Sequence, residues 1–506
     1  MKRLHPQASP LAALADEREY PMVVIDWIYL LFVSTAIGWA MFKAKRAPGS
    51  SQSAVIALYI GGLALLPAAA YRDIGPGGVD VAKVFPVWFI GILIPTPFLV
   101  INKGWIAPLT ALICAALLDR QRLANFKPKL LDVPIVLFCL LPVIQRLIGT
   151  ADPAPPTLTS TLLLAGCWLL PWIIGRIYIN NRAGRIILID GLIIFSIILV
   201  PISIIEGISE FRFHEFLYGT HPFAKVGTAR YIGFRPLAFF EDGNQYGIWM
   251  CCAALAAWWR FRFNETGRLQ LYRFVLAFIL LLTALASQSI GAIILMIIFM
   301  IWLEVAAWLE RHRWIYQMGL FSTAAVGGLL LSGALTIASL GATTERIERI
   351  AMFFFSIGRQ SLQWRIGRAR DNLPQLQEFI VAGRGRWDWY TTFRPWDLPL
   401  MLVGFFGLIG LALVVMAIGA AVWRRRWQRP ARKGSTRYLF LALIGMAIAD
   451  AFMNTYVFLP ALAMLGGLAP APHPSWRRAG RPHPYLGLAA PAPAAPALAA
   501  GGSKPD

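Results

Sequence analysis

Long apolar segments recur along the 506-residue chain, and they constrain its fold more than any other feature. A helix that crosses a bilayer needs about 20 mostly apolar residues. Such segments lie near 22–42, 53–70, 83–101, 104–118, 132–150, 160–179, 186–205, 246–259, 274–288, 290–309, 315–340 and 398–423. A final segment, 438–470, is too long for one helix, and Asp450 and Asn454 near its middle predict a hairpin of two. The pattern predicts an all-α integral membrane protein with about 12 to 14 transmembrane helices.

The composition agrees with this class. Hydrophobic residues make up 58% of the chain and charged residues 14%, whereas a soluble domain has about 25% charged residues. An ordinary soluble enzyme and a disordered scaffold are both excluded. We expect a polar N-terminal segment over 1–21, a membrane domain over 22–468 and a disordered Pro/Ala-rich tail over 469–506.

Positive charge exceeds negative charge by 21. On a soluble chain this would indicate nucleic acid as a partner, but in a membrane protein basic loops mark the cytoplasmic side. From residue 119 onward every second loop is basic, so we expect these loops in the cytoplasm and no nucleic acid partner. Lys43, Lys45 and Arg46 fall on the wrong side if all four early apolar segments span. The basic clusters are Arg120, Arg122, Lys127 and Lys129; Arg182 and Arg185; Arg260, Arg262, Arg268 and Arg273; Arg311 and Arg313; and the group from Arg424 to Arg437.

Two long connections, 206–245 and 341–397, are expected on the external side. The second has nine arginines, six acids and no lysine, which runs against the usual charge bias. The guanidinium group of arginine forms bidentate hydrogen bonds with phosphate, whereas the ammonium of lysine acts as a point charge. The pattern therefore indicates an anionic ligand; surface pairing with the acids and lipid headgroups is the alternative. Residues 358–372 have the spacing of an amphipathic helix with Arg365 and Arg368 on one side, suited to headgroup binding or to a plain interfacial position.

The 206–245 connection brings further charged groups close to the membrane. Arg230 and Arg235 precede the next apolar segment, and Glu241 and Asp242 lie within one helical turn of it. A short polar turn, Ser287–Ser289, is expected on the same side and is more often structural than functional. The six histidines do not cluster, and no nucleotide-binding or Ser-His-Asp motif is present. We expect no metal and no cofactor.

Three pieces of the sequence resemble the O-antigen ligase and polymerase superfamily of bacterial cell envelopes. The first is Arg230-Tyr-Ile-Gly-Phe followed by Asn244 through Gly247 at the start of a span. The second is Ser287 to Gly291, which resembles the family's short Ser-Arg-Gly turn but has Gln288-Ser289-Ile290 in place of its arginine. The third is Gly358-Arg359 with Trp364, then Gly383-x-Gly385 and Gly404 through Gly410. Their order along 150–460 is similar to that of the family.

The resemblance implies a C-type glycosyltransferase-like fold in the bacterial inner membrane, with one large periplasmic loop. It implies an undecaprenyl-pyrophosphate-linked glycan as donor, a second glycan or a lipid A core as acceptor, the lipid bilayer and a chain-length regulator as further candidate partners, and no nucleotide or metal. Four arginines are the candidates for holding the pyrophosphate: Arg230, Arg235, Arg359 and Arg365. They would stabilise the negative charge that develops on the leaving group.

One departure bears on the chemistry. Ligase members carry a His-Asn pair before the span that follows the large loop, whereas this chain has Trp396-Asp397 and no histidine in 341–397. Asp397, Glu241 and Asp242 are the candidates for the base that accepts the acceptor hydroxyl's proton. The difference favours a polymerase over a ligase, and exopolysaccharide as much as O-antigen. A flippase-like transporter and a structural component of an envelope complex are the alternatives; the lack of repeated halves argues against transport.

Overall fold

The computed structural model describes ten segments of the chain, together with Ala229 and a few single positions between 319 and 363. All belong to one compact unit, Met1–Pro470. Helices account for 84% of these residues and no strand occurs among them, which confirms the predicted all-α class for this part of the chain. The polar segment 1–21 and residues 470–506 lie outside the described residues. The ten segments are 24–46, 51–68, 102–149, 157–218, 232–263, 269–308, 380–383, 397–422, 435–454 and 458–469.

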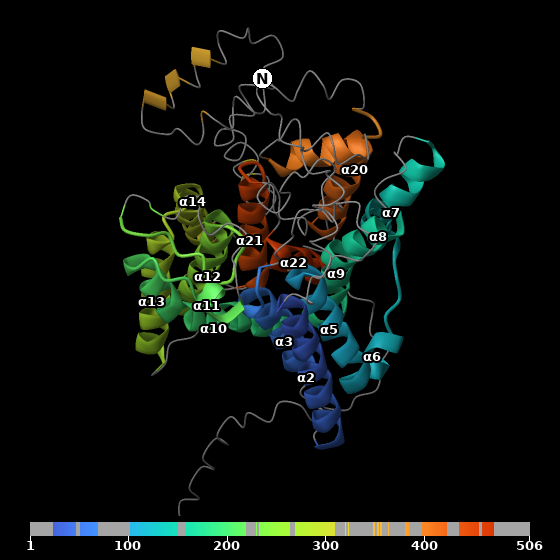
Figure 1. Ribbon diagram of the computed structural model, residues 1–506, viewed down its shortest axis with the longest axis horizontal. Helices are drawn as coiled ribbons and strands as arrows, with labels where there is room; N and C mark the ends of the chain where they lie inside the picture. Colours follow the sequence, from blue (N-terminus) through green and yellow to red (C-terminus); the bar gives the residue numbers. More distant parts are fainter. Residues whose placement is uncertain are drawn as a thin grey trace, which may run out of the picture. The chain divides into compact units, whose positions relative to one another are not determined.

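Most of the helices form on the apolar segments identified above and are labelled in Figure 1. In chain order they are α2 (Val24–Arg46), α3 (Ser51–Leu65), α5 (Lys103–Leu118), α6 (Arg120–Ala124), η2 (Leu130–Asp132), α7 (Val133–Leu147), α8 (Thr157–Leu164), η3 (Ala165–Leu169), α9 (Leu170–Ile174), η4 (Gly175–Ile179), α10 (Arg182–Ile208), α11 (Phe213–Tyr218), α12 (Gly243–Phe263), α13 (Gln270–Ala286), α14 (Ile290–Trp308), α20 (Leu398–Val422), α21 (Thr436–Ala451) and α22 (Leu459–Leu468).

Short polar side chains set where several helices begin. Asn102 accepts a hydrogen bond from the Trp105 N–H (3.1 Å) at the start of α5, and Asn181 accepts one from the Gly184 N–H (2.7 Å) at the start of α10. Such caps satisfy backbone N–H groups that have no partner inside the helix. The apolar segments therefore become helices with defined first turns.

Five helical segments in the described part are long and apolar enough to cross a membrane, as expected for a membrane protein. Shorter apolar helices accompany them, among them α3, α5 and α13. The predicted total of 12 to 14 crossings stays a prediction. The five are Trp27–Lys45, Leu130–Leu147, Ser160–Ile179, Arg182–Ile208 and Leu398–Val422.

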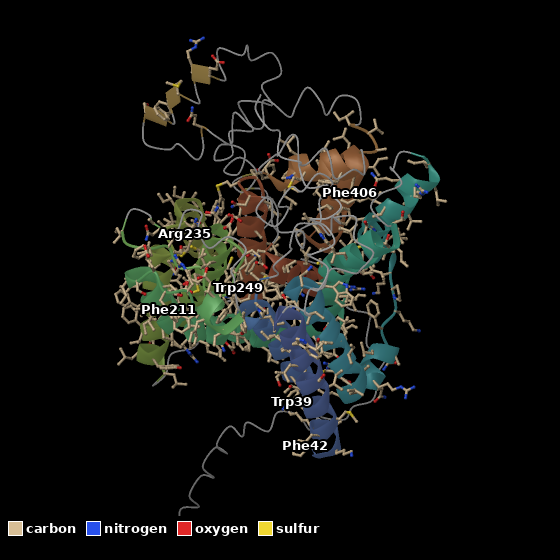
Figure 2. All side chains as sticks on the ribbon, viewed as in Figure 1. Trp39, Phe42, Phe211, Arg235, Trp249 and Phe406 are labelled. Carbon is tan, nitrogen blue, oxygen red and sulfur yellow. The ribbon has the colours of Figure 1, made fainter. Side chains whose placement is uncertain are left out.

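The surface of α2 shows why an apolar solvent is needed. Its sequence is apolar around most of its circumference, and Trp39 and Phe42 are 39% and 54% exposed on it (Figure 2). Trp27 and Leu31 on the same helix are more exposed still. A contiguous apolar surface of this kind is costly in water and favourable in lipid.

Contacts at the helix ends define two ends of the bundle. Ser51 at the start of α3 donates to the Asp119 carboxylate just after α5 (2.9 Å), and Gln52 lies 3.5 Å from Asn181 at the start of α10. Arg185 in α10 donates to the Thr436 hydroxyl at the start of α21 (2.8 Å). We call this the basic end, because it also carries several basic side chains, as the alternation of loops predicts. They are Arg120, Arg122, Arg182, Arg185, Arg260 and Arg262.

Helices α10 and α12 run antiparallel between the two ends. Near the basic end Arg260 forms a two-pronged ion pair with Asp190 (2.7 and 2.8 Å). Further along, Trp249 donates to the Ser196 hydroxyl (3.0 Å). The Tyr246 hydroxyl is hydrogen bonded to the Ser203 hydroxyl, about one helical turn before the end of α10. The end of α10 and the start of α12 therefore lie together at the opposite end. We call it the motif end, after Ile232–Phe234, Asn244–Gly247 and Ser287–Ser289, which meet there.

The first helices resolve the disagreement in the early charge pattern. Tyr29 near the start of α2 packs with Ile106 at the start of α5, whereas Ala40 packs with Cys114 near the end of α5. The two helices are therefore parallel, and Lys43 and Lys45 at the end of α2 lie at the basic end. Helix α3 ends and α5 begins at the motif end, so α2, α3 and α5 place the end of α2 with the basic loops. The predicted span 83–101 lies outside the described residues.

Two further features concern the C-terminal helices. The apolar segment 438–470 forms two helices, α21 and α22, with a break after Ala451. The break lies where it was predicted, whereas the hairpin of two spans stays a prediction, because α22 has only 10 residues. Helix α20 has a break of its own at Gly407, whose φ is +67°, and Figure 1 shows it as two helical arms. At this break the N–H groups of Leu408 and Ile409 donate to the carbonyl oxygens of Ile380 and Val381 (2.7 and 3.3 Å).

Gln145 of α7 completes the joint at Gly407. Its side-chain amide donates to the carbonyl oxygens of Ala382 (2.7 Å) and Phe405 (2.6 Å). The chain around Gly383 therefore lies against α20 about ten residues, or roughly 15 Å of helix, from its start. Backbone groups freed by a helix break inside a membrane protein need such partners.

Candidate functional site

Glu206 organises the backbone at the motif end. It is fully buried in the last turn of α10. One carboxylate oxygen accepts hydrogen bonds from the N–H groups of Leu237 and Ala238 (2.8 Å each), and the other accepts one from Phe213 (3.0 Å). Arg212 lies 3.6 Å away as an ion-pair partner. Glu206 therefore holds both arms of the 206–245 connection against α10.

Arg235 joins three parts of the motif end (Figure 2). Its side chain donates to the Asn244 side-chain oxygen (2.6 Å) at the start of α12 and to the Ser287 carbonyl oxygen (3.3 Å) after α13. Gly243 leaves room for it, since a Cβ there would lie 2.2 Å from the guanidinium Nε. Arg235 is 4% exposed. Arg235, predicted to bind pyrophosphate, is therefore buried and donates hydrogen bonds to other residues of the protein.

The short turn 287–289 contacts both Ile232 and the start of α12. Gln288 has a φ of +54°, which is costly for a residue with a side chain. Its amide donates to the Ile232 carbonyl oxygen (2.6 Å) and accepts from the Ile232 N–H (3.2 Å). Ser289 donates to the Asn244 side-chain oxygen (3.4 Å), and Gly247 packs closely against it. The first two motifs, more than 40 residues apart in sequence, are therefore in direct contact.

Two of the three carboxylates predicted as candidate bases cap helices. Asp242 accepts hydrogen bonds from the N–H groups of Asn244 and Gln245 (3.1 Å to Gln245) at the start of α12. Asp397 accepts one from the Leu400 N–H (2.8 Å) at the start of α20. A carboxylate in this position stabilises the helix through its N–H groups and its dipole. The geometry supplies a structural role for both.

Asp397 also lies close to the motif end. The N–H of the next residue, Leu398, donates to the Asn454 carbonyl oxygen (3.1 Å) after α21. Met453, the residue before Asn454, lies against Gly291 in the first turn of α14. Asp397 and the Ser287–Ser289 turn are therefore connected through two neighbouring contacts.

Glu241 differs from the other two carboxylates. It lies two residues before α12 and is 1% exposed. Neither of its carboxylate oxygens has a hydrogen-bond partner among the described residues. Lys103, the first residue of α5, places its ammonium 3.6 Å from one of these oxygens, and the Lys103 side chain is also buried. Buried polar groups without hydrogen bonds are uncommon and mark sites where a further partner is expected.

The environment of Glu241 shifts its protonation. Burial raises the pKa of the Glu241 carboxyl above its ordinary value, because the charged form is poorly solvated there, and the nearby Lys103 ammonium acts in the opposite direction. Glu206, another buried carboxylate of this end, pairs with Arg212 instead. A buried carboxyl with a raised pKa, whose oxygens accept no hydrogen bond from the described residues, is suited to accept or release a proton.

The remaining predicted ligands lie outside the described residues. They are Arg230, Arg359 and Arg365, together with the amphipathic helix predicted over 358–372. Lys103 and Glu206 were not identified from the sequence, although each is a single charged residue at the edge of an apolar segment. That position was the available signal. In the described part of the chain, no three His, Cys, Asp or Glu side chains are grouped so that they could hold a metal ion.

Comparisons with known proteins leave the chain without a match: no protein-family model, no curated protein and no solved structure is similar to it. The resemblance to ligases and polymerases therefore rests on the motifs in the sequence. Two of those motifs are in contact at one end of the bundle.

Proposed function

We propose that this chain transfers or polymerises glycans carried on undecaprenyl pyrophosphate, in O-antigen or exopolysaccharide biosynthesis. The reaction takes place at the motif end, which faces the periplasm of a bacterial inner membrane. The donor is the lipid-linked glycan, and the acceptor is a second lipid-linked glycan or a lipid A core. The protein is a glycosyltransferase that needs neither a metal nor a nucleotide.

The meeting of distant sequence motifs at one end is the observation that supports this proposal most directly. Gln288 binds Ile232 through both atoms of its amide, and Arg235 binds Asn244 and the turn that carries Gln288. These contacts gather residues from the 206–245 connection, α12 and the α13–α14 turn. The buried carboxylate of Glu241, which accepts no hydrogen bond from the part of the chain that the structure describes, lies in the same connection.

The arginines carry the electrostatic part of the proposal. Arg230, Arg359 and Arg365 bind the pyrophosphate and stabilise the charge that develops as it leaves. Arg235 has a supporting role, since it holds the start of α12 against the α13–α14 turn. The basic residues at the basic end take no part in the reaction; they set the orientation of the protein in the membrane.

A lipid-linked glycan transporter is the second candidate. The buried Lys103–Glu241 pair favours it to some extent, because buried charges in membrane proteins often mark transport or proton pathways. The pair lies next to the end of the bundle, where α5 and α12 begin. This position favours a reaction at one face of the membrane over a pathway through it.

Deletion of the gene, read on polysaccharide gels, distinguishes the candidates. Products that carry single repeats indicate a polymerase, and free polymer with a bare lipid A core indicates a ligase. Either result supports the proposal. Lipid-linked units that accumulate on the cytoplasmic leaflet indicate a transporter, and unchanged polysaccharide indicates another function; both would overturn it.

A further inference from the structure

The described hydrogen bonds at Glu241 involve its backbone and not its carboxylate. Its N–H donates to the Gln245 side-chain oxygen (3.0 Å), and the adjoining Asp242 caps α12. The carboxylate is buried, yet both oxygens lack hydrogen-bond partners among the described residues. A buried acceptor without a hydrogen bond is unfavourable, and a charged one more so, so this arrangement points to a further partner.

Lys103 comes from a distant part of the chain and faces this carboxylate. Its ammonium donates to the Phe239 carbonyl oxygen (2.6 Å) and lies 4.5 Å from the centre of the Phe240 ring. These two contacts fix the ammonium 3.6 Å from Glu241. That separation is too long for a hydrogen bond between them, and one oxygen atom from a third group can contact both.

We propose that the Lys103–Glu241 pair binds the hydroxyl group of the acceptor sugar, with Glu241 as the general base and Lys103 as a positioning residue. This inference rests on the proposed function. A hydroxyl suits the pair because it donates one hydrogen bond and accepts others. It donates to the Glu241 carboxylate and accepts from a Lys103 N–H that is not used by Phe239. A phosphate would be repelled by the carboxylate.

The reaction step follows from this placement. The acceptor oxygen forms a bond to the anomeric carbon of the donor sugar while its proton passes to Glu241. The bond between that carbon and the pyrophosphate oxygen breaks, and the pyrophosphate leaves with the bonding electrons. Lys103 keeps its charge throughout and holds the attacking oxygen in line. Glu241 then returns its proton to solvent.

The pH dependence follows from the surrounding charges. Lys103 faces Glu241 from α5; in the same region Glu206 pairs with Arg212, and Asp242 caps α12. Because a base works only when deprotonated, the rate falls as the pH drops through the raised pKa of Glu241. Replacement of Lys103 by Met removes the charge that lowers this pKa. The acidic limb of the rate profile should therefore move to higher pH.

The test uses the purified full-length protein in detergent or vesicles with an undecaprenyl-pyrophosphate-linked repeat unit. Product growth and released undecaprenyl pyrophosphate are measured across pH. We expect Glu241→Gln to lower the rate at least 100-fold, and Lys103→Met to slow it and shift its acidic limb upward. The matched control is Glu215→Gln, the same change at an exposed position of α11, which should behave like the wild type.

A structural ion pair is the competing explanation, and a double variant separates the two. Removal of one partner of a buried pair destabilises a protein, whereas replacement of both by neutral groups often does not. Lys103→Met combined with Glu241→Gln should therefore fold like the wild type and stay inactive. A folded and active double variant would overturn the inference while the proposed function stands. Absence of transfer by the wild type would instead count against the proposed function itself.

Discussion

Arg359 is the residue that the sequence motifs tie most closely to the pyrophosphate. Its replacement by Ala should abolish polymer production in cells while the protein still inserts into the membrane, because Arg359 belongs to the predicted external connection 341–397 and to none of the apolar segments. Arg359→Lys should also be poor, because the two-pronged grip on phosphate is lost. Polysaccharide gels and membrane immunoblots measure both effects. Unchanged chain length and yield in the Ala variant would remove Arg359 from the site, and full activity in the Lys variant would reduce its role to charge alone.

Glu206 and Glu241 are both buried carboxylates of the motif end, yet their surroundings assign them different roles. Glu206 accepts three backbone hydrogen bonds and pairs with Arg212, so its bonding capacity is used within the protein. The Glu241 carboxylate accepts no hydrogen bond from the described residues and has Lys103 as an ion-pair partner at 3.6 Å. A charged residue can therefore stabilise the fold in one place and be available for chemistry in another, and burial alone does not distinguish the two.

The role of Glu206 leads to a stability prediction. Glu206→Gln leaves one acceptor oxygen for three N–H donors and an unpaired Arg212, so it should lower the free energy of unfolding by about 3–5 kcal/mol. Thermal unfolding of the purified protein in detergent measures this. Glu210→Gln, four residues further along and exposed, is the control and should change stability by less than about 0.5 kcal/mol. Equal melting temperatures for the two variants would contradict the account of Glu206.

At the scale of single elements, the break in α20 is the feature with the clearest consequence. Gly407 has a left-handed backbone, and a Cβ at this position would lie 2.0 Å from the Val381 carbonyl oxygen. Gly407→Ala should cost at least about 1–2 kcal/mol from the backbone conformation alone. It should also loosen the segment around Gly383, which limited proteolysis would detect.

Gly419 of the same helix offers a matched comparison. It is helical, and a Cβ there would meet nothing within 4 Å. Gly419→Ala should therefore leave stability unchanged or raise it by about 0.5–1 kcal/mol. Opposite signs for the two variants are expected in thermal unfolding. A loss of stability at Gly419 equal to that at Gly407 would mean that the break is not the cause.

The sequence predicts which segments are helical far better than how they meet. The runs 186–205 and 290–309 correspond to α10 and α14 within four residues, because an apolar segment of this length has only the helix available to it. The break at Gly407 has no proline to mark it. It depends on Ile380, Val381 and Gln145, which approach from distant parts of the chain.

The candidate site was predictable to the extent that it consists of local sequence. Glu241, Asp242 and Arg235 stand out because charged residues are rare next to an apolar segment. The role of each of these residues depends on partners from distant parts of the chain, which the local sequence does not reveal. Asp242 caps α12, Arg235 binds Ser287, and Lys103 reaches Glu241 from a helix 138 residues earlier in the chain.

At the scale of the whole molecule, the described charges are divided between two ends. The basic end carries arginines and lysines that the positive-inside rule explains. The motif end carries the buried carboxylates Glu206 and Glu241 and the capping residues Asp242 and Asp397. The same division places Lys43 and Lys45 with the other basic residues, which the sequence alone did not resolve.

This division predicts which end a reagent outside the cell can reach. Single cysteines introduced by Glu210→Cys at the motif end and Arg120→Cys at the basic end replace exposed side chains. The five native cysteines are buried, so they should give little background. In intact cells of a bacterial host without an outer-membrane barrier, a membrane-impermeant maleimide should label only the Glu210→Cys protein. Labelling of only the Arg120→Cys protein would reverse the proposed orientation.

Glycan transfer by the purified protein, in vesicles that contain only undecaprenyl-pyrophosphate-linked repeat units, tests the proposed glycosyltransferase activity most directly. Nucleotide is omitted and a chelator removes divalent metal ions. We expect glycans longer than one repeat to form, with one undecaprenyl pyrophosphate released for each new linkage. Movement of intact lipid-linked units across the bilayer, with no linkage formed and no lipid pyrophosphate released, would contradict the proposed activity.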